Sequence, residues 1–381
     1  GYDVTVFEKE EEAGGSLRYL TPAFRLDREV LDEQIRVLEA AGVEFRFRME
    51  LGSDISLESL KKEGYESIFL AMGAGEADPV EGTMSVRDYL RSAPGVRAHE
   101  GGSVLVAGSD LDAVDAARTA VRSGAGQVTL LLSGKRPARI NMADQIGLAL
   151  EEGVQLIENG LFLQATEGGA RILLSGLETD FPCDQIILSA DKALKIDLPQ
   201  DLEFAQGKIR IDRKTGAASL PGVFAGGDAS GSRDMISSIA SAKTAAAAID
   251  RELRGEHATV PEISQVKTVD RELVLSRHGY IKKAGQTLKL TREQAADRIE
   301  HFGLTTRTMT EEEAVQEASR CLNCGCGEGC QICKTICSVF APYISAPDIL
   351  TIDREECVAC GMCALRCPIH NIDMISLGTT I

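Results

Sequence analysis

Residues 357–368 read CVACGMCALRCP and place four cysteines at C-x2-C-x2-C-x3-C spacing, with a proline directly after the last one. Soft thiolates bind zinc, copper(I) or iron–sulfur clusters in preference to hard cations. Three thiolates spaced two residues apart wrap one corner of a cubane, and a fourth thiolate three residues further on points away from it. This is the bacterial arrangement for [4Fe–4S] clusters, in which the fourth cysteine ligates the other cluster of a pair. The run therefore predicts a second cysteine run in the same chain.

A second cysteine-rich segment, CLNCGCGEGCQICKTIC, occupies residues 321–337. Its last three cysteines, Cys330, Cys333 and Cys337, keep the same spacing, whereas Cys326 stands one residue further from Cys330 than the ideal pattern requires. Structural zinc sites are the alternative for such cysteines. Zinc pairs of the C-x2-C type rarely repeat as interlocked triplets, so the spacing favours iron–sulfur clusters.

The segment after residue 320 resembles a ferredoxin domain that holds two [4Fe–4S] clusters. The resemblance implies one cluster on Cys326, Cys330, Cys333 and Cys367, and the other on Cys337, Cys357, Cys360 and Cys363. Cys321 and Cys324 are left over as spare thiols, as alternatives to Cys326, or as ligands of another group.

Length, charge and cysteine distribution limit the classes of protein to which this chain can belong. A chain of 381 residues is expected to form two or three domains. The net charge of −17 argues against nucleic acid and anionic membranes as partners. Ten of the 11 cysteines follow residue 320, which indicates a local metal site in a reducing interior instead of a disulfide framework. With no apolar run of ~18 residues and no signal peptide, the prediction is a cytoplasmic protein that does not contact membranes.

The N-terminal residues GYDVTVFEKE predict a buried strand at Val4–Phe7 that ends in an acid, Glu8. In a dinucleotide-binding βαβ unit, an Asp or Glu about 20 residues after the first glycine loop binds the ribose hydroxyls. Glu8 fits that acid, and a solvated strand end is the simpler alternative. Only seven residues precede Glu8, so we expect the glycine loop, its strand and its helix to lie outside this chain.

The residues that follow resemble the glutamate synthase small-subunit family of flavoproteins, a branch of the oxidoreductases with two dinucleotide-binding domains. The matching pieces are the Gly14–Gly15 turn, the segment TPAFRL, an amphipathic helix from about Asp27 to Ala41, and GVEF. The resemblance covers roughly residues 1–320. It implies a protein that binds FAD in one domain and NAD(P) in a second domain inserted into the first.

The resemblance also implies where the flavin binds. Ala71 and Gly73 end the strand of YESIFLAMGAG, and LPGVFAGGDASGS supplies the partner strand and Asp228, which in that family binds the ribityl and pyrophosphate portion. A helix rich in small residues, from about Asp234 to Leu253, follows and is expected to pack closely on the sheet. The residues implied to line the flavin site are Glu8, Gly14, Gly15, Ala71, Gly73, Gly226, Gly227 and Asp228.

Between the two flavin segments lies a second Rossmann-like unit, which begins with a strand at Ser103–Ala107. The family uses this unit for NAD(P)H, but the fingerprint here is not G-x-G-x-x-G/A. The sequence keeps Gly108 and Ala113 as nucleotide-binding candidates and places Asp110 where the second glycine normally lets the backbone approach the pyrophosphate. A carboxylate and a pyrophosphate repel each other at contact distance.

Two further features of the inserted domain concern the nucleotide. In LSGKRPAR, Lys135 and Arg136 can pair with a 2′-phosphate, which favours NADP(H) over NAD(H) if the site is functional. The family's usual IGQ-x-P stretch is replaced by SADKAL at Ser189–Leu194. A Rossmann scaffold without a nucleotide is therefore the alternative.

No C-x-x-C accompanies the flavin motifs, and Cys183 stands alone. We therefore expect no disulfide-reductase mechanism and interpret Cys183 as a packed small hydrophobe. The five histidines are scattered, and none lies beside an obvious nucleophile in the sequence. The sequence predicts no catalytic side chain.

The predicted fold is α/β, with two interleaved Rossmann-like domains for FAD and NAD(P), truncated at the N-terminus, and a small α+β ferredoxin-like iron–sulfur domain. The predicted domains are 1–78 and 205–255 for FAD, 79–204 for the NAD(P)-binding-like insertion, 256–320 for a linker and helix, and 321–381 for the iron–sulfur domain.

Together these domains predict an oxidoreductase that passes electrons between NADPH, FAD and two [4Fe–4S] clusters, and on to a partner subunit or soluble ferredoxin. Two alternatives stay open: an electron-transfer relay whose nicotinamide site is non-functional, and a non-catalytic assembly subunit without flavin turnover. Asp110 favours the relay, and the intact Gly226–Asp228 motif argues against the assembly subunit.

Overall fold

The computed structural model describes residues 1–73, 75, 80–92, 101–134, 140–189, 198–232, 234–256, 288, 292–319, 331–346, 349–367, 372 and 374. The chain forms two compact units. Unit 1 comprises Gly1–Pro261 and Arg292–Thr306, and unit 2 comprises Glu262–Thr291 and Arg307–Ile381. Among the helices of the described segments, none is long and apolar enough to cross a membrane.

Two short parallel sheets carry the part of unit 1 that is predicted to bind flavin. They pair β1 (Thr5–Glu8) with β2 (Glu44–Phe47), and β3 (Ile68–Leu70) with β14 (Val223–Ala225). Phe7 of β1 meets the ring of Tyr65 edge-on, with centroids 5.7 Å apart, and packs in the same buried cluster as β3 and β14. The pairing of β3 with β14 confirms the two partner strands predicted from the sequence.

Helix boundaries in this part follow local capping signals. The helices are α1 (Gly15–Tyr19), α2 (Arg28–Ala40), α3 (Leu57–Lys62) and α7 (Met235–Leu253). Asp27 caps α2 by accepting a hydrogen bond from the amide of Glu29, and Asp234 caps α7 by accepting one from the amide of Ser237. Such caps stabilise a helix by about 1 kcal/mol each. The helices predicted around residues 27–41 and 234–253 are confirmed.

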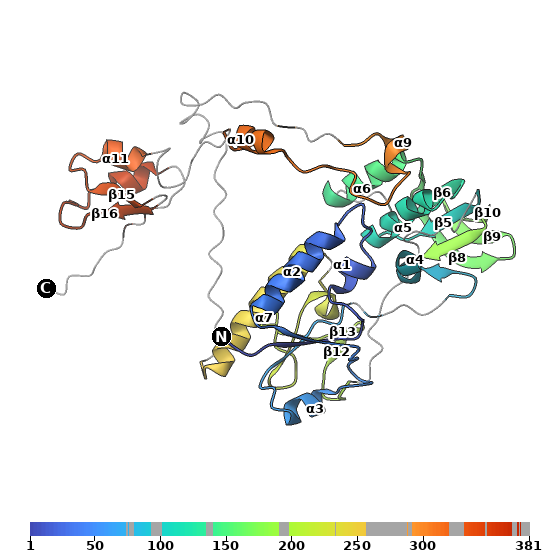
Figure 1. Ribbon diagram of the computed structural model, residues 1–381, viewed down its shortest axis with the longest axis horizontal. Helices are drawn as coiled ribbons and strands as arrows, with labels where there is room; N and C mark the ends of the chain where they lie inside the picture. The colour runs from blue at the N-terminus through green and yellow to red at the C-terminus, as the bar shows by residue number, and fades with distance from the viewer. Residues whose placement is uncertain are drawn as a thin grey trace. The chain divides into compact units, whose positions relative to one another are not determined.

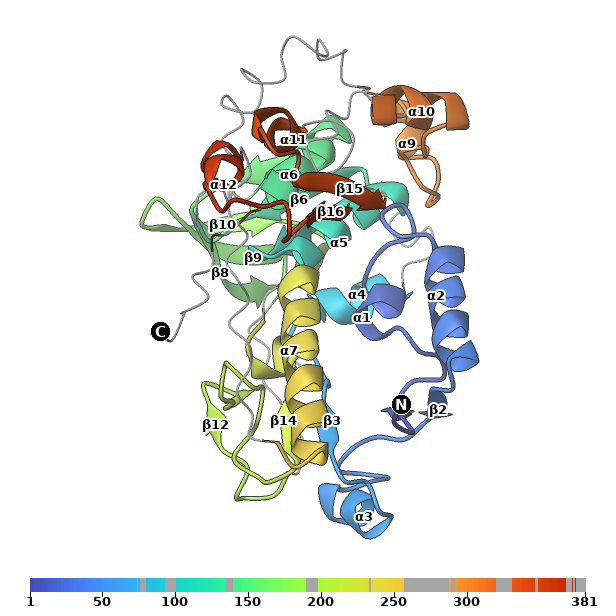
Figure 2. The ribbon, with the colours of Figure 1, turned by 90° about the vertical axis from the view of Figure 1, so that its left-hand side faces the viewer.

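The long helix α7 lies along β14 and β3 (Figure 2). Ala245 and Ala248 are fully buried there against Phe224 of β14. Small side chains on this face let the helix come close to the sheet, as the sequence predicted. Three short elements complete this part: β12 (Phe204–Ala205), β13 (Lys208–Ile209) and the 3-10 helix η1 (Gly227–Ser230).

The inserted part of unit 1 is a five-stranded parallel sheet with the order β4-β11-β5-β6-β7. Its strands are β4 (Met84–Ser85), β5 (Ser103–Ala107), β6 (Gln127–Leu131), β7 (Gln155–Ile157) and β11 (Gln185–Leu188). Its helices are α4 (Val86–Ser92), α5 (Leu111–Arg122) and α6 (Ile140–Glu151). This is a Rossmann-like arrangement, and the strand predicted at 103–107 is confirmed.

An antiparallel meander of three strands follows β7 in the chain (Figure 1). It consists of β8 (Gly160–Thr166), β9 (Gly169–Leu174) and β10 (Leu177–Pro182). Ala170 and Ile172 of β9 are buried in one cluster with Leu105 and Leu131 of the parallel sheet. The meander therefore covers one face of the inserted domain.

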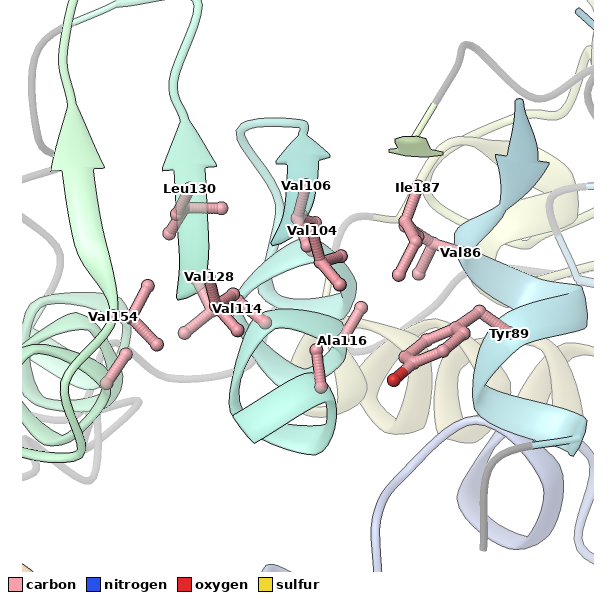
Figure 3. Packing of buried hydrophobic residues seen from close by; sticks show 14 of the residues in the cluster. Val86, Tyr89, Val104, Val106, Val114, Ala116, Val128, Leu130, Val154 and Ile187 are labelled. Carbon is pink, nitrogen blue, oxygen red and sulfur yellow. The ribbon is translucent and has the colours of Figure 1, made fainter. Parts of the chain in front are cut away.

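The core on the opposite face of the inserted sheet is shown in Figure 3. Val104, Val106 and Leu130 from the strands pack with Val114 of α5 and Tyr89 of α4. Leu20, from the segment between α1 and α2, belongs to the same buried cluster. The part of unit 1 that is predicted to bind flavin and the inserted part therefore share a core, and burial of such side chains contributes roughly 1.5–3 kcal/mol each.

The described elements of unit 2 are α10 (Glu311–Ser319), α11 (Ile332–Ile336), β15 (Pro342–Ala346), β16 (Ile349–Ile352) and α12 (Met362–Arg366). β15 and β16 pair antiparallel, and α11 and α12 lie side by side (Figure 2). Arg307 donates two hydrogen bonds to Glu313 in the first turn of α10, each 2.6 Å long. The short helix α9 (Ala295–Arg298) belongs to unit 1.

Candidate cofactor sites

The strands β3 and β14 end at the same edge of their sheet. Ala225 is the register partner of Leu70, and the amide of Gly226 donates to the carbonyl of Leu70 at 3.2 Å. Residues 71–73 and 226–228 therefore leave the sheet next to each other, although they are far apart in the sequence. In open α/β sheets, ligands bind at this carboxyl edge.

Glycine geometry at this edge suits close approach of a cofactor to the backbone. At Gly226 an added Cβ would lie 2.6 Å from Cζ of Phe69 and 3.1 Å from Oγ of Ser241, so no side chain fits there. Gly227 has φ of 64° and donates its amide to Oγ of Ser241 at 2.9 Å. Gly73 has φ of 77° with open space in front of it. The open space at Gly73 fits the approach of FAD that the resemblance implies, whereas packing against Phe69 explains why residue 226 is glycine.

The other flavin candidates lie in the β1 and α1 region. Glu8 is the last residue of β1, and one of its carboxylate oxygens accepts a hydrogen bond from the amide of Glu10 at 3.0 Å. Gly14 has φ of 124° at the N-cap of α1, where an added Cβ would lie 2.9 Å from Leu31. Gly15 has φ of 49° with open space around it. Packing against Leu31 explains why residue 14 is glycine. The flavin contacts of Glu8, Gly14 and Gly15 stay predictions.

In the loop between β5 and α5, Gly108 and Ala113 are needed for close packing of the strand on the helix. A Cβ on Gly108 would lie 2.6 Å from Cβ of Ser189 and 2.8 Å from Cβ of Ala113. Ala113 is fully buried in the first turn of α5. Lys135 and Arg136, the predicted 2′-phosphate partners, lie outside the described residues.

Asp110 caps α5 and is also bound from a neighbouring strand. One carboxylate oxygen accepts the amide of Ala113 at 3.0 Å, and the other accepts the hydroxyl of Ser189 at 2.6 Å. The two departures from the family pattern, at Asp110 and at Ser189, therefore contact each other. The sequence indicated both departures but not their contact, because they stand 79 residues apart.

A buried cluster of charges joins the C-terminal part of α5 to the residue that follows α6. Glu152 accepts two hydrogen bonds from each of Arg118 and Arg122, between 2.8 and 3.0 Å, and Nε of Arg298 lies 3.2 Å from it. The guanidinium groups of Arg118 and Arg122 lie 4.5 and 4.1 Å from the ring centroid of Phe24. Burial by itself would raise the pKa of Glu152, but the hydrogen bonds and charges of Arg118 and Arg122 lower it to about 2.

A second ion pair joins the TPAFRL segment to α5. Arg25, in the TPAFRL segment, pairs with Asp115 of α5, whose side chain is almost fully buried. Burial raises the pKa of Asp115 to about 7, against the opposing effect of Arg25. Neither network was predicted from the sequence. The available signal was the charged residues at Asp115, Arg118 and Arg122, spaced three and four residues apart inside an alanine-rich helix.

The cysteine module contains an internal repeat. α12 follows α11 at a constant offset of 30 residues, which makes Cys363 the counterpart of Cys333 and Cys367 the counterpart of Cys337. Each helix starts after a left-handed residue, Gln331 in one copy and Gly361 in the other, and each ends at a cysteine in extended conformation. This two-fold repetition fits a pair of sites that each take the fourth cysteine of the other run.

The described thiols of the module form no disulfides. They belong to Cys333, Cys337, Cys357, Cys360, Cys363 and Cys367. The predicted ligands Cys326 and Cys330, with Cys321 and Cys324, lie outside the described residues. Within the described part of the chain, no three His, Cys, Asp or Glu side chains are gathered into a metal-binding group. The donor set, made only of thiols, fits an iron–sulfur cluster.

Cys183 lies apart from this module, in unit 1. It is half-buried and packs against the cluster that holds Leu105 and Ile186. Burial, with a smaller effect from Asp184, raises the pKa of its thiol. A raised pKa leaves little thiolate at neutral pH, which agrees with the interpretation of Cys183 as a packing residue.

Comparison with solved structures supports the fold of unit 1. A 2-naphthoyl-CoA reductase in complex with 2-naphthoyl-CoA superposes with a TM-score of 0.51 at 19% identity, over 64% of this chain and 36% of that one. A thioredoxin reductase from T. acidophilum superposes with a TM-score of 0.50 at 16% identity, over 67% and 91% of the two chains. At these identities the likeness concerns the fold alone.

Curated relatives are more similar in sequence. The beta subunit of an NADP(+)-dependent formate dehydrogenase from Moorella thermoacetica is 30% identical over 296 residues, which cover 67% of this chain and 41% of the relative. Subunit PreT of an NAD-dependent dihydropyrimidine dehydrogenase from Escherichia coli (strain K12) is 31% identical over 267 residues, covering 67% and 64%. The small chain of a glutamate synthase [NADPH] from Azospirillum brasilense is 27% identical over 274 residues, covering 60% and 57%. The chain spans less than two thirds of each relative.

Family models match both units. Residues 350–373 match the 4Fe-4S binding domain, which covers the cysteine run at residues 357–368. Residues 2–248 match the pyridine nucleotide-disulphide oxidoreductase model, which spans most of unit 1. The chain therefore belongs to the pyridine nucleotide-disulphide oxidoreductase family and carries a 4Fe-4S binding domain in its C-terminal part.

Proposed function

We propose that this chain is the electron-transfer subunit of a larger oxidoreductase, in which FAD and two [4Fe–4S] clusters on one polypeptide exchange electrons with a partner. One observation carries the proposal: a single chain joins the flavin oxidoreductase family match at 2–248 to the 4Fe-4S match at 350–373. When bound, FAD exchanges electrons in pairs or singly, and each cluster carries one electron at a time.

The residues of this chain have binding and orienting roles in the proposal. Gly73 leaves open space at the carboxyl edge of β3 and β14, so the flavin can approach the backbone there, and Gly226 lets the ring of Phe69 pack against the neighbouring strand end. Asp228, in η1, is proposed to bind the ribityl and pyrophosphate portion. Ala71, Gly227 and the ribose-binding Glu8 complete this proposed site. The open space at Gly73 argues against an assembly subunit, which would not need an open edge.

For the clusters, we propose the ligand sets that the sequence implies. Cys337 would join Cys357, Cys360 and Cys363 on one cluster, and Cys367 would join Cys333 and two cysteines outside the described residues on the other. The repeat that relates α11 to α12 supports this exchange of fourth ligands, since Cys337 and Cys367 occupy equivalent ends of their helices. The module thereby holds two one-electron carriers close together.

The partner is proposed from the relatives. Those described above are named as a beta subunit, as subunit PreT and as a small chain of larger enzymes. We extend this to a catalytic partner subunit, with a soluble ferredoxin as the other candidate acceptor. The acidic net charge of −17 fits a protein partner with a basic docking surface better than nucleic acid.

Two donors are candidates for the flavin. NADP(H), bound with the help of Lys135 and Arg136, is the donor that the family resemblance implies. The second candidate is a relay in which the partner supplies the electrons directly. The hydrogen bond between Ser189 and Asp110 favours the relay, because it holds a carboxylate at the loop that would receive the nucleotide.

Anaerobic photoreduction tests the electron path without any nucleotide. The chain, prepared with FAD, iron and sulfide, is illuminated with a sacrificial donor so that the flavin is reduced first, and the cluster absorbance is followed. We expect the clusters to bleach after the flavin and to recover when oxidised ferredoxin is added. Clusters that stay oxidised beside a fully reduced flavin would contradict the proposed function.

A further inference from the structure

The loop between β5 and α5 is connected by side chains to both strands that flank β5 in the sheet. Ser189, directly after β11, donates its hydroxyl to Asp110 at 2.6 Å. On the other side, the amide of Ser133, which follows β6, donates to Oγ of Ser109 at 3.0 Å, and the two hydroxyl oxygens lie 2.8 Å apart. Hydrogen bonds therefore connect the loop to the ends of both neighbouring strands, at the carboxyl edge where a dinucleotide crosses such a sheet.

The Asp110 carboxylate also occupies the end of the helix. Its second oxygen accepts the amide of Ala113, one of the backbone donors that α5 leaves unpaired at its N-terminus. In a dinucleotide-binding unit these donors and the helix dipole face the pyrophosphate. Here they face a carboxylate that belongs to the chain itself, and the helix dipole stabilises its negative charge.

An aspartate at an N-cap is common in helices and would mean little alone. The bond from Ser189 is the independent observation, since it comes from a different strand and engages the oxygen that the cap does not use. Gly108 provides a third observation, because the absence of a side chain there lets Ser189 pack directly on the loop. A Cβ on Gly108 would lie 2.6 Å from Cβ of Ser189. The three residues form one packed and hydrogen-bonded unit.

We infer that Asp110, held by Ser189, is an internal ligand of the α5 N-terminus that excludes the pyrophosphate of NAD(P)H from this loop. The inference rests on the proposed function and decides between its two donors. Exclusion of the nucleotide favours the second donor of the proposed function, the partner subunit.

Calorimetric binding of oxidised NADP⁺ and NAD⁺ to the anaerobic holoprotein tests the inference. Oxidised nucleotides are used so that no turnover accompanies binding. We expect dissociation constants above about 1 mM for the native chain, outside the usual range for enzyme substrates. Asp110→Asn keeps an acceptor for the Ala113 amide but removes the charge, and Asp110→Gly restores the family residue. Each should tighten NADP⁺ binding by at least about tenfold.

Asp112→Asn is the matched control, because Asp112 lies in the same first turn without a bond to Ser189, and it should change the affinity less than about threefold. Native binding of NADP⁺ in the micromolar range would overturn the inference. So would the absence of any gain in both Asp110 variants, with circular dichroism showing them folded. Photoreduction of the same preparations tests the proposed function separately: clusters that fail to bleach would defeat that function, whatever the nucleotide affinities are.

Discussion

The carboxylate of Glu152 accepts two hydrogen bonds from Arg118, at 2.9 and 2.8 Å, with both side chains at most 1% exposed. Arg122 donates two more, and Phe24 lies against both guanidinium groups. A buried ion pair contributes little compared with apolar residues of the same volume, but losing one partner leaves a buried charge uncompensated. Glu152 therefore holds together α5, α6 and the TPAFRL segment, and its removal should be costly.

Glu152→Gln should destabilise unit 1 by about 3–5 kcal/mol, because it leaves the buried guanidinium groups of Arg118 and Arg122 without their counter-charge. Urea unfolding followed by circular dichroism measures the change. The matched control is Glu151→Gln. Glu151 is the preceding residue and is 59% exposed. It pairs with the buried Arg298, which also lies 3.2 Å from Glu152 and so keeps a carboxylate partner, and the loss of Glu151 should therefore cost less than the loss of Glu152. Equal losses in the two variants would contradict the role given to Glu152.

Asp115 should make the stability of unit 1 fall as the pH rises toward neutrality. Burial raises its pKa to about 7 in the folded chain, against about 3.9 in the unfolded chain. Between these values the folded state binds more protons than the unfolded state, so stability decreases with rising pH, by up to about 1.4 kcal/mol per pH unit. Asp115→Asn should remove this slope.

The measurement for Asp115 is the free energy of unfolding between pH 4.5 and 8, native chain against Asp115→Asn. Glu152 does not interfere, because its pKa of about 2 lies below the unfolded value and its contribution is lost only as the pH falls below about 4.5. Parallel curves for the two proteins over this range would show that Asp115 stays charged at all these pH values.

The anaerobic chain should contain about eight iron and eight sulfide ions, from two cubanes. Cys360→Ala should lower the iron content by about half, because Cys360 is a proposed ligand and lies in the matched 4Fe-4S segment. Cys183→Ala should leave it unchanged, since Cys183 packs in unit 1. Iron and sulfide analysis gives the result, and stoichiometric zinc without sulfide would favour the structural zinc alternative.

Gly226→Ala should weaken FAD binding by at least about tenfold. The new Cβ would lie 2.6 Å from Phe69, so the ring of Phe69 or the backbone at residue 226 must shift where β3 and β14 end. Overpacking of this kind costs about 1–3 kcal/mol. Gly147→Ala is the control, because this glycine lies within α6 with open space around its Cβ position. FAD content after gel filtration distinguishes them, and full retention by Gly226→Ala would remove Gly226 from the site.

Much of the local structure followed from the sequence because its signals act over a few residues. Asp27 and Asp234 mark the starts of α2 and α7 through caps that each need only the next turn. The apolar run 103–107 became β5 as predicted. Cysteine spacing indicated iron–sulfur chemistry for the same reason, since three ligands of one cluster lie within seven residues, and the 4Fe-4S match at 350–373 agrees.

The long-range contacts were decided only by the tertiary structure. Ser189 and Asp110 meet across 79 residues, and Arg25 and Asp115 across 90, because the strand order places β11 beside β5 and the shared core brings TPAFRL onto α5. A single sequence carries no periodic signal for such pairs. It indicated that Asp110 departs from the dinucleotide fingerprint, but the effect of that carboxylate depends on the partner that the folded sheet brings to it.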